Sequence, residues 1–295
     1  MKRKKVGLVL SGGGARGFAH IGVIKTLEKN NIPIDIVSGT SIGAVVGALY
    51  CAGYSGVQLE QIAKETNWKN LIDLAIPKKG ILKGDKIEAY LRDLIDDKKF
   101  SELKKPLFIP AVDLNKQQEI IFYKGDVVKA IRASISLPGI FLPVETGERV
   151  LVDGGVLDNL PIEVLRENDA EIIIAVNLNQ REIKEKVYEK ISKEQKKEPV
   201  KNFHIASLIS ESYNMLEIEK TRLFLEDFPV EVLITPELKD TRIHQFQKID
   251  SIIKRGTNAC EKEMNKIKLL TKEKKSFGKG AINFFKKAKD IIKKD

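Results

Sequence analysis

The sequence has few cysteines, few histidines and no long hydrophobic run. Its two cysteines, Cys51 and Cys260, belong to no CxxC pair and lie in no histidine cluster. We therefore expect neither a disulfide framework nor a metal site, and no cofactor. No stretch approaches the roughly 18 apolar residues of a membrane-spanning helix. The apolar stretch that follows residues 2–5 is five residues long, whereas a signal-peptide core has about 7–15. These absences predict a cytoplasmic protein.

Positive charge is concentrated at the two ends of the chain. The formal net charge is +10, of which residues 2–5 contribute +4 and residues 271–295 contribute +6. The rest of the chain is neutral in sum. A neutral body with basic ends favours contact between one end and an anionic surface over a nucleic-acid groove across the fold. We expect no nucleic-acid partner.

Strand-like and helix-like segments alternate near the N-terminus. Val6–Leu10 and Ile34–Val37 are predicted strands, and Phe18–Asn30 and Ala44–Ala52 are predicted helices. This order predicts an α/β fold with parallel strands and helices on both faces of the sheet. Further predicted elements are strands at Leu107–Val112, Glu119–Tyr123, Arg149–Val152, Glu171–Leu178 and Val230–Ile234, helices within 58–97, at 204–226 and after Ile243, and a charged exposed helix or connector at 179–202.

Residues 39–43 form a GxSxG sequence, Gly-Thr-Ser-Ile-Gly, between a predicted strand and a predicted helix. In that context the chain turns sharply and presents the serine in a strained, exposed position, while Gly39 and Gly43 leave room for the backbone. The following helix brings its N-terminal N–H groups close to a developing oxyanion. We interpret Ser41 as a nucleophile. The alternative is a glycine-rich turn with a capping serine.

Residues 12–17, Gly-Gly-Gly-Ala-Arg-Gly, follow the first predicted strand. Consecutive glycines leave backbone N–H groups unobstructed, and such groups can hold the oxyanion of a tetrahedral intermediate. The same residues match the GxGxxG dinucleotide pattern, for which Asp35 lies at the distance of a ribose-binding acid. However, Asp35 falls inside the predicted strand Ile34–Val37, and residues 39–43 occupy the place where a ribose would bind. A dinucleotide-dependent oxidoreductase is therefore the weaker interpretation.

Asp153 begins an Asp-Gly-Gly sequence at the end of the predicted strand Arg149–Val152. A carboxylate at the C-terminal end of a strand faces the crevice in which α/β proteins place their sites. Taken alone, the motif is more simply interpreted as an Asp-Gly turn.

Only three histidines are present: His20, His204 and His244. Ser41, Asp153 and either of the two later histidines would have the chain order of an α/β-hydrolase triad. Neither histidine has support from its local sequence, so a Ser–Asp dyad is the better interpretation.

Together, the motifs at 12–17, 39–43 and 153–155 resemble those of the patatin-like phospholipase family. The resemblance covers about residues 6–179 and extends to GFAHIGV (17–23), ASISLPGIFLP (133–143) and DGGVLDNLP (153–161). Each motif alone is common, whereas all of them in this order and spacing are specific. The sequence is most similar to the compact bacterial members.

The resemblance implies a three-layer α/β/α sandwich with a mainly parallel central sheet, within a catalytic domain spanning 1–270. It implies Ser41 as nucleophile and Asp153 as a base that acts without histidine. The implied oxyanion hole comprises Gly12, Gly13, Gly14, Arg16 and Gly17. The expected reaction is hydrolysis of carboxylic esters of acyl lipids through an acyl-enzyme, of the phospholipase, lysophospholipase or esterase type.

Residues 271–295 are a separate basic tail. On a helix, residues 277–292 would gather phenylalanine, alanine and isoleucine on one side and most lysines on the other. This pattern is typical of an interfacial membrane helix, and also of a terminal helix packed on the domain with its lysines in water. A lipid substrate favours the first interpretation, so we expect peripheral contact with an anionic membrane, on its inner face.

Two other functions remain as alternatives. One is a catalytically weak, membrane-lipid-binding regulatory protein on the same fold, against which the presence of both Ser41 and Asp153 argues. The other is an α/β-hydrolase-type esterase with a Ser–Asp–His triad.

Overall fold

The structure of the chain is a computed structural model that describes residues 3–71, 73, 82–179, 205–238, 241–243 and 245–272. The charged stretch at 179–202 and the basic tail lie almost entirely outside the described residues, as do His204 and His244. Within the described part, none of the helices has the length and apolar character needed to cross a membrane.

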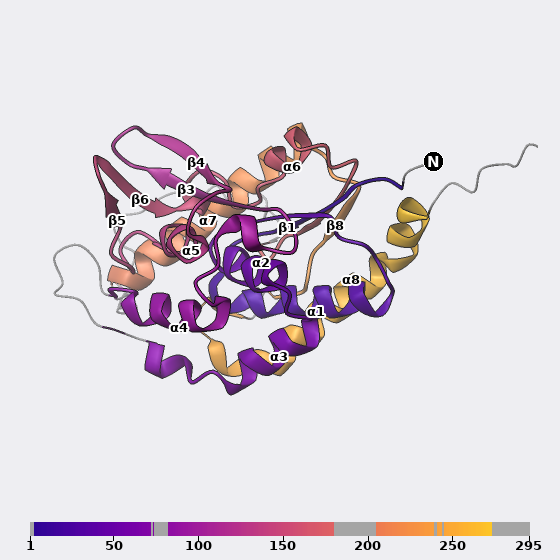
Figure 1. Cartoon of the computed structure of the whole chain (residues 1–295), viewed down its shortest axis with the longest axis horizontal. Coiled ribbons are helices and arrows are strands. Elements are labelled where there is room, and N and C mark those ends of the chain that lie inside the picture. Colours follow the sequence, from indigo (N-terminus) through magenta and orange to yellow (C-terminus); the bar gives the residue numbers. More distant parts are fainter. Residues whose placement is uncertain are drawn as a thin grey trace, which may run out of the picture.

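One mixed sheet runs through the molecule (Figure 1). Its strands are β1 (Val6–Leu10), β2 (Ile36–Gly39), β3 (Leu107–Asp113), β4 (Gln118–Phe122), β5 (Val144–Thr146), β6 (Arg149–Asp153), β7 (Ile172–Val176) and β8 (Val232–Ile234). Their order is β5-β6-β3-β2-β1-β7-β8, and β4 also pairs with β3. The pairs from β3 through β2, β1 and β7 to β8 are parallel, whereas β4, β5 and β6 pair antiparallel.

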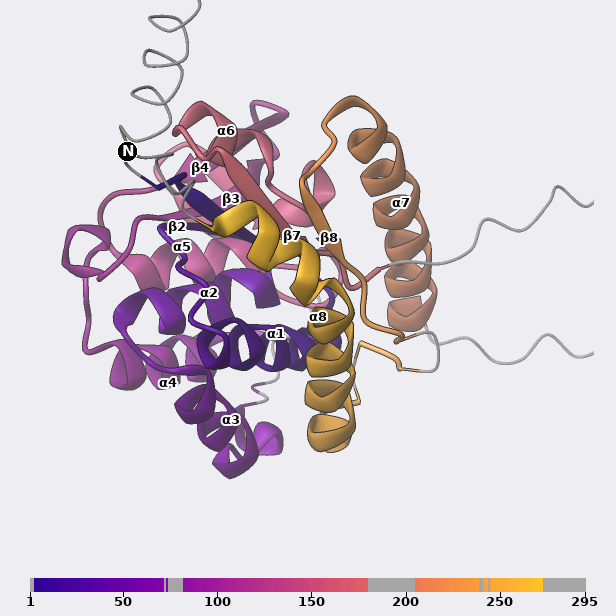
Figure 2. The same ribbon diagram turned by 90° about the vertical axis from the view of Figure 1, so that its right-hand side faces the viewer.

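Helices cover both faces of this sheet (Figures 1 and 2). One face carries α1 (Phe18–Lys29), α2 (Ile42–Ala52), α3 (Gly56–Glu65), α4 (Asp85–Ile95), α5 (Val127–Ser134) and α8 (Ile249–Thr271), and the other carries α6 (Glu163–Glu167) and α7 (Ile205–Asp227). Successive side chains of a strand point to opposite faces, so Leu8 and Leu10 join the larger core and Val9 the smaller one. The predicted three-layer α/β/α architecture is confirmed.

The parallel register places two loops side by side. Leu10 at the end of β1 pairs with Gly39 at the end of β2. Because both strands point the same way, residues 12–17 and 39–43 leave the sheet at one edge. This is the edge at which α/β proteins place their sites.

Several predicted elements have shifted ends. The helix α2 begins at Ile42, directly after Ser41, rather than at Ala44. The strand β2 begins at Ile36, so placing Asp35 inside a strand was wrong. Asp35 forms an ion pair with Arg3 and accepts the Val6 N–H at 2.8 Å. It lies at the edge of the sheet opposite to the glycine motifs, which further weakens the dinucleotide interpretation. The short elements α5, α6 and β5 were not predicted.

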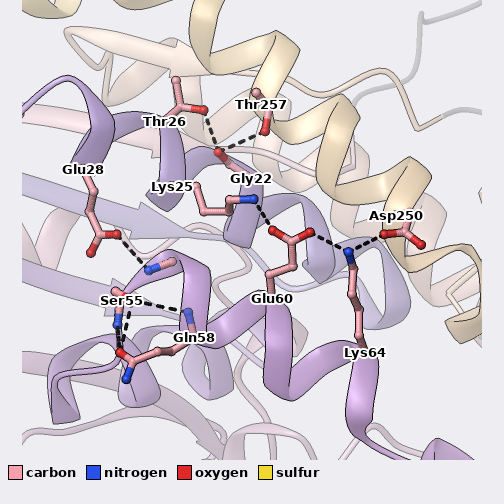
Figure 3. A network of polar contacts seen from close by, with 11 residues as sticks. Gly22, Lys25, Thr26, Glu28, Ser55, Gln58, Glu60, Lys64, Asp250 and Thr257 are labelled. Carbon is pink, nitrogen blue, oxygen red and sulfur yellow. Dashed lines mark hydrogen bonds and ion pairs between the residues drawn. The ribbon is translucent and has the colours of Figure 1, made fainter.

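Helices α1 and α8 cross with their backbones in contact. A Cβ on Gly22 would overlap the backbone oxygen of Ile253, and a Cβ on Gly256 would overlap that of Ala19. The Gly22 carbonyl also accepts a hydrogen bond from the Thr257 hydroxyl at 3.4 Å (Figure 3). The crossing therefore depends on the absence of a side chain at both glycines.

Charged side chains connect α3 to the same pair of helices (Figure 3). Glu60 of α3 forms ion pairs with Lys25 of α1 and with Lys64, and Lys64 also contacts Asp250 of α8 at 2.7 Å. Exposed ion pairs usually contribute less than ~1 kcal/mol. The backbone contact between α1 and α8 is the stronger constraint.

The substitution Gly256→Ala tests this crossing. Alanine normally favours a helix over glycine by about 1 kcal/mol, but here its methyl group must push α8 away from Ala19. We expect a net loss of about 1–3 kcal/mol in the free energy of unfolding, as in other overpacked cores, measured by urea denaturation. Asn258→Ala, at an exposed position of α8, is the control and should not destabilise. Equal unfolding midpoints for the Gly256→Ala variant and the unchanged protein would contradict the crossing.

Candidate active site

Ser41 lies in the tight turn between β2 and α2. Its backbone angles, φ 54° and ψ −120°, are ones that non-glycine residues rarely adopt and that store strain. A Cβ on Gly39 would overlap the carbonyl group of Gly43, and a Cβ on Gly43 would overlap that of Leu10. The two glycines therefore allow the close backbone contacts of a nucleophile turn.

The glycine loop packs against this turn. A Cβ on Gly12 would lie 3.3 Å from the Ser41 Cβ and 2.5 Å from Asn159 Oδ1. The Gly12 N–H donates to the side-chain oxygen of Asn159 at 3.1 Å and to its backbone oxygen at 3.3 Å. Gly12 is thus held by a residue of the 153–161 motif, and its N–H is occupied.

Gly13 and Gly14 have positive φ values of 151° and 56°. Among the described residues, no hydrogen bond engages their N–H groups. The next two N–H groups are occupied, since Ala15 donates to the Ile243 oxygen at 2.7 Å and Arg16 donates to the Gly13 oxygen at 3.3 Å. Of the expected loop residues, Gly13 and Gly14 are the ones that offer N–H groups to a ligand.

Arg16 and Gly17 shape the loop by other contacts. The buried Arg16 side chain donates to Asn214 Oδ1 at 2.7 Å and, through Nε, to the Gly13 oxygen at 3.3 Å. A Cβ on Gly17 would overlap the side chain of Ile42, the residue after Ser41. The glycine at position 17 therefore gives room to the start of α2.

The Asp153 carboxyl group lies beside Ser41 at the end of β6. Asp153 is 2% exposed, and its Oδ1 accepts the Gly155 N–H at 2.9 Å. Burial raises the pKa of Asp153 to about 7, while hydrogen bonds from the Ser41 side chain and the Gly155 N–H act in the opposite direction. A carboxyl group with a pKa near neutrality can accept and return a proton at neutral pH.

Two buried serines hold the backbones of Ser41 and Asp153. Ser134 Oγ accepts the Ser41 N–H at 3.0 Å, and the Ser136 carbonyl accepts the Asp153 N–H at 3.0 Å. Arg132 holds Ser136 in turn through a 2.7 Å hydrogen bond to its hydroxyl. Both serines belong to the ASISLPGIFLP motif (133–143), for which the sequence pattern indicated no role of the serines. The available signal was a pair of serines two residues apart in a segment otherwise rich in apolar residues.

His20, the one histidine among the described residues, supports the glycine loop. His20 on α1 is fully buried, and its Nε2 lies 2.8 Å from the Ser11 oxygen, immediately before the glycine loop. Burial lowers the pKa of His20 to about 4, so the ring is neutral at neutral pH. His20 thus bonds to Ser11, and not to Asp153 or Ser41.

A cavity of about 260 Å³ adjoins the site between residues 155–160 and α7. Its wall includes Asn159 and Glu217 beside apolar Leu160 and Leu223. The side-chain nitrogen of Asn159 is buried and has no hydrogen-bond partner among the described residues.

Across the described part of the chain, no group of three or more His, Cys, Asp or Glu residues could hold a metal ion.

The fold resembles that of VipD from Legionella pneumophila. The TM-score to its crystal structure is 0.61 at 12% sequence identity, over 90% of this chain and 67% of VipD. At this identity, the likeness concerns the fold alone.

Two sequence relatives each match about three fifths of this chain. Lysophospholipase NTE1 of Debaryomyces hansenii is 35% identical over 184 residues, which are 60% of this chain and 12% of the relative. An uncharacterized NTE family protein of Mycobacterium bovis is 38% identical over 181 residues, which are 59% of this chain and 49% of the relative. The chain thus spans less than half the length of these relatives.

A family model described as patatin-like phospholipase matches residues 8–166, more than half of the chain. The chain belongs to the patatin-like phospholipase family.

Proposed function

We propose that the chain is a serine lipid acyl hydrolase that cleaves carboxylic esters of acyl lipids. The observation that carries this proposal is the meeting of Ser41, in its strained turn, with the buried carboxyl group of Asp153. A hydroxyl group needs an adjacent base to become a nucleophile. A base works best when its pKa lies near the working pH, and burial raises that of Asp153 to about 7.

In the proposed reaction, Ser41 Oγ attacks the ester carbonyl as its proton passes to Asp153. The N–H groups of Gly13 and Gly14 stabilise the oxyanion of the tetrahedral intermediate. When the intermediate collapses, Asp153 gives the proton to the leaving alcohol, and the acyl group stays on Ser41. Water, deprotonated by Asp153, then hydrolyses the acyl-enzyme and restores both side chains.

In the proposed oxyanion hole, some loop residues donate hydrogen bonds to the oxyanion and others hold the loop in place. Gly13 and Gly14 supply the donors, because their N–H groups are the ones without partners among the described residues. Gly12 and Arg16 support the loop, the first through Asn159 and the second through its hydrogen bond to the Gly13 oxygen. Each well-placed donor contributes about 10²–10³ in rate.

The proposed substrates are ester-linked acyl lipids, with lysophospholipids the first to test. Relatives that are 34–35% identical over 184 residues carry the name lysophospholipase NTE1, although they extend far beyond this chain. Purified protein should be assayed against phospholipid, lysophospholipid, triacylglycerol and short p-nitrophenyl esters. Binding of lipid without turnover of any of these esters would favour the regulatory, lipid-binding alternative.

The variants Ser41→Ala and Asp153→Asn test the dyad. Each removes one of two groups that act as a unit, so turnover of a p-nitrophenyl ester should fall by roughly 10⁴-fold or more. His204→Ala and His244→Ala leave the dyad intact and should retain most activity. Circular dichroism checks that each variant is folded. Full activity of the Ser41→Ala enzyme would refute the proposed function, and loss of activity in a folded histidine variant would support the Ser–Asp–His triad.

The raised pKa of Asp153 predicts opposite effects of pH on activity and on stability. The base must be ionised, so kcat/KM should rise about tenfold per pH unit up to about pH 7 and then level off. An aspartate in the unfolded chain has a pKa near ~3.9, so the folded state binds the proton of Asp153 more tightly than the unfolded state does. The contribution of Asp153 to the free energy of unfolding therefore falls as the pH rises from about 4 to 7. Thermal denaturation should therefore show that the inactive Asp153→Asn variant loses less stability over this range than the unchanged protein. A kcat/KM that is constant from about pH 5 to 8 would contradict the assignment.

We also propose that residues 1–270 form the catalytic domain and that the basic tail 271–295 contacts an anionic membrane. Met264 and Ile267 of α8 belong to the larger core, which supports the inclusion of α8 in the domain. In the sequence, the tail carries nine lysines against three acidic residues. Each lysine near an anionic lipid surface contributes about 1 kcal/mol.

Deletion of residues 273–295 removes all but the first two residues of the tail and keeps α8, which ends at Thr271. The truncated protein should co-sediment less with phosphatidylserine vesicles than the full chain, and the difference should shrink at high salt because exposed charges are screened. Hydrolysis of vesicle lipid should slow, whereas turnover of a soluble short ester should persist. If both forms bind vesicles equally, the tail does not contact the membrane.

A further inference from the structure

The helix α7 has an inverted pattern of burial. Its buried side chains include Asn214 and Glu217, 6% and 7% exposed, whereas Met215 and Leu216 are each 63% exposed. A helix that packs on a core normally buries its apolar stripe. Figure 2 shows α7 apart from the helices of the opposite face. The polar face of α7 points inward, toward the site, and Phe224 near its C-terminal end packs on the smaller core.

Asn214 reaches the glycine loop through Arg16. Arg16 Nη2 donates to Asn214 Oδ1 at 2.7 Å, and Arg16 Nε donates to the Gly13 oxygen at 3.3 Å. The peptide unit is planar and trans, so its C=O and N–H groups point in opposite directions. A hydrogen bond that holds the Gly13 oxygen therefore fixes the direction of the Gly14 N–H. Asn214 thus acts on one of the proposed oxyanion donors through Arg16.

Glu217 reaches the turn after Asp153. A Cβ on Gly155 would overlap Glu217 Oε1 and would lie 2.8 Å from the Tyr213 hydroxyl oxygen. The two side chains of α7 therefore lie directly against the Gly155 backbone, whose N–H donates to Asp153 Oδ1 at 2.9 Å. This contact explains why the second glycine of the Asp-Gly-Gly motif has no room for a side chain.

Two further hydrogen bonds fix this contact. Glu217 Oε2 accepts the side-chain N–H of Asn179 at 3.1 Å, just beyond the end of β7. One turn along α7, the Lys220 ammonium group donates to the Val156 oxygen at 2.6 Å. Glu217 thus lies against Gly155 and Lys220 holds the next residue, Val156, while Asn179 fixes Glu217 to the sheet.

The charges around Glu217 explain how two acidic groups can be close neighbours in a buried site. Asp153 lies close enough to oppose ionisation of Glu217, and Arg16 and Lys220 favour it. Burial has the largest effect and raises the pKa of Glu217 well above its usual range. Burial therefore favours the protonated form of Glu217 next to Asp153.

We propose that α7, which lies beyond the matched family region, carries two positioning residues of the site: Asn214 orients the Gly13–Gly14 peptide through Arg16, and Glu217 holds the Gly155 turn against Asp153. This proposal rests on the proposed hydrolase function. Neither residue contacts the reacting atoms, and both act through groups that do.

The first test uses Asn214. Asn214→Leu keeps a similar size and removes the acceptor of the Arg16 Nη2 hydrogen bond, so kcat on a soluble p-nitrophenyl ester should fall by roughly 10–100-fold, with KM little changed. Asn214→Asp restores an acceptor and should retain most of kcat. The control Met215→Ala changes the adjacent residue on the exposed face of the same helix and should behave like the unchanged protein. A folded Asn214→Leu enzyme with unchanged kcat would overturn the role of Asn214.

The second test uses Glu217. Glu217→Gln keeps the shape of the side chain and an oxygen that can contact Gly155 or Asn179, so it should retain most of kcat. Glu217→Ala removes these contacts and should lower kcat by roughly 10–100-fold. The alanine variant also admits water beside Asp153, so the acid limb of its kcat/KM profile should move to lower pH. Equal kcat and equal pH profiles for the glutamine and alanine variants would overturn the role of Glu217. This comparison also decides the matter if the Asn214→Leu variant does not fold.

Failure of the hydrolase function and failure of the positioning role give different results. If Ser41→Ala retains activity, the hydrolase function itself is wrong. If Ser41→Ala is inactive but the α7 variants match the Met215→Ala control, the function stands and α7 has no positioning role. Thermal denaturation of each variant separates loss of positioning from loss of fold.

Discussion

A carboxyl group kept out of water beside a serine is the constraint on which this structure depends. An aspartate in water is too weak a base to activate a hydroxyl group, and burial raises the pKa of Asp153 to about 7. The same burial disfavours the charged form, so the fold must supply hydrogen bonds to it. It does so with the Gly155 N–H and the Ser41 side chain, while Ser41 itself stays half-buried and open to a ligand. A base of this kind gives the proposed mechanism no need of histidine.

The fold holds Ser41 and Asp153 in place with backbone groups as much as with side chains. Parallel pairing of β1 and β2 brings the glycine loop and the Ser41 turn to one edge. Ser134, the last residue of α5, then accepts the Ser41 N–H, and the Ser136 carbonyl, two residues later, accepts the Asp153 N–H. Each of these bonds satisfies a group that would otherwise be unpaired at the rim of the sheet. The strained turn at Ser41 persists because such neighbours determine its geometry.

The sequence was sufficient wherever the information was local. Consecutive residues determine the backbone conformation in the turn at 39–43, in the loop at 12–17 and in the Asp-Gly-Gly turn. The α/β fold and the candidate dyad could therefore be predicted. The bond from Gly12 to Asn159 joins residues 147 positions apart, and that from Ser41 to Ser134 joins residues 93 apart. No local pattern reveals such partners. Asp35 was misplaced because a strand-like run of apolar residues surrounds a side chain that instead pairs with Arg3.

Sequence analysis predicted the helix at 204–226 but could not show that its polar side faces the site. A helix with buried polar residues and an exposed apolar side has no distinctive periodicity of its own, because hydrophobic spacing indicates a helix but not the side that is buried. Buried polar groups are tolerated when they are paired, and Asn214 with Arg16 and Glu217 with Asn179 form such pairs. Since α7 lies outside the matched residues 8–166, a chain can retain every family motif and still change the surroundings of Asp153. In the proposed mechanism the motifs supply the reacting groups, and α7 adds side chains that pack against the turn after Asp153.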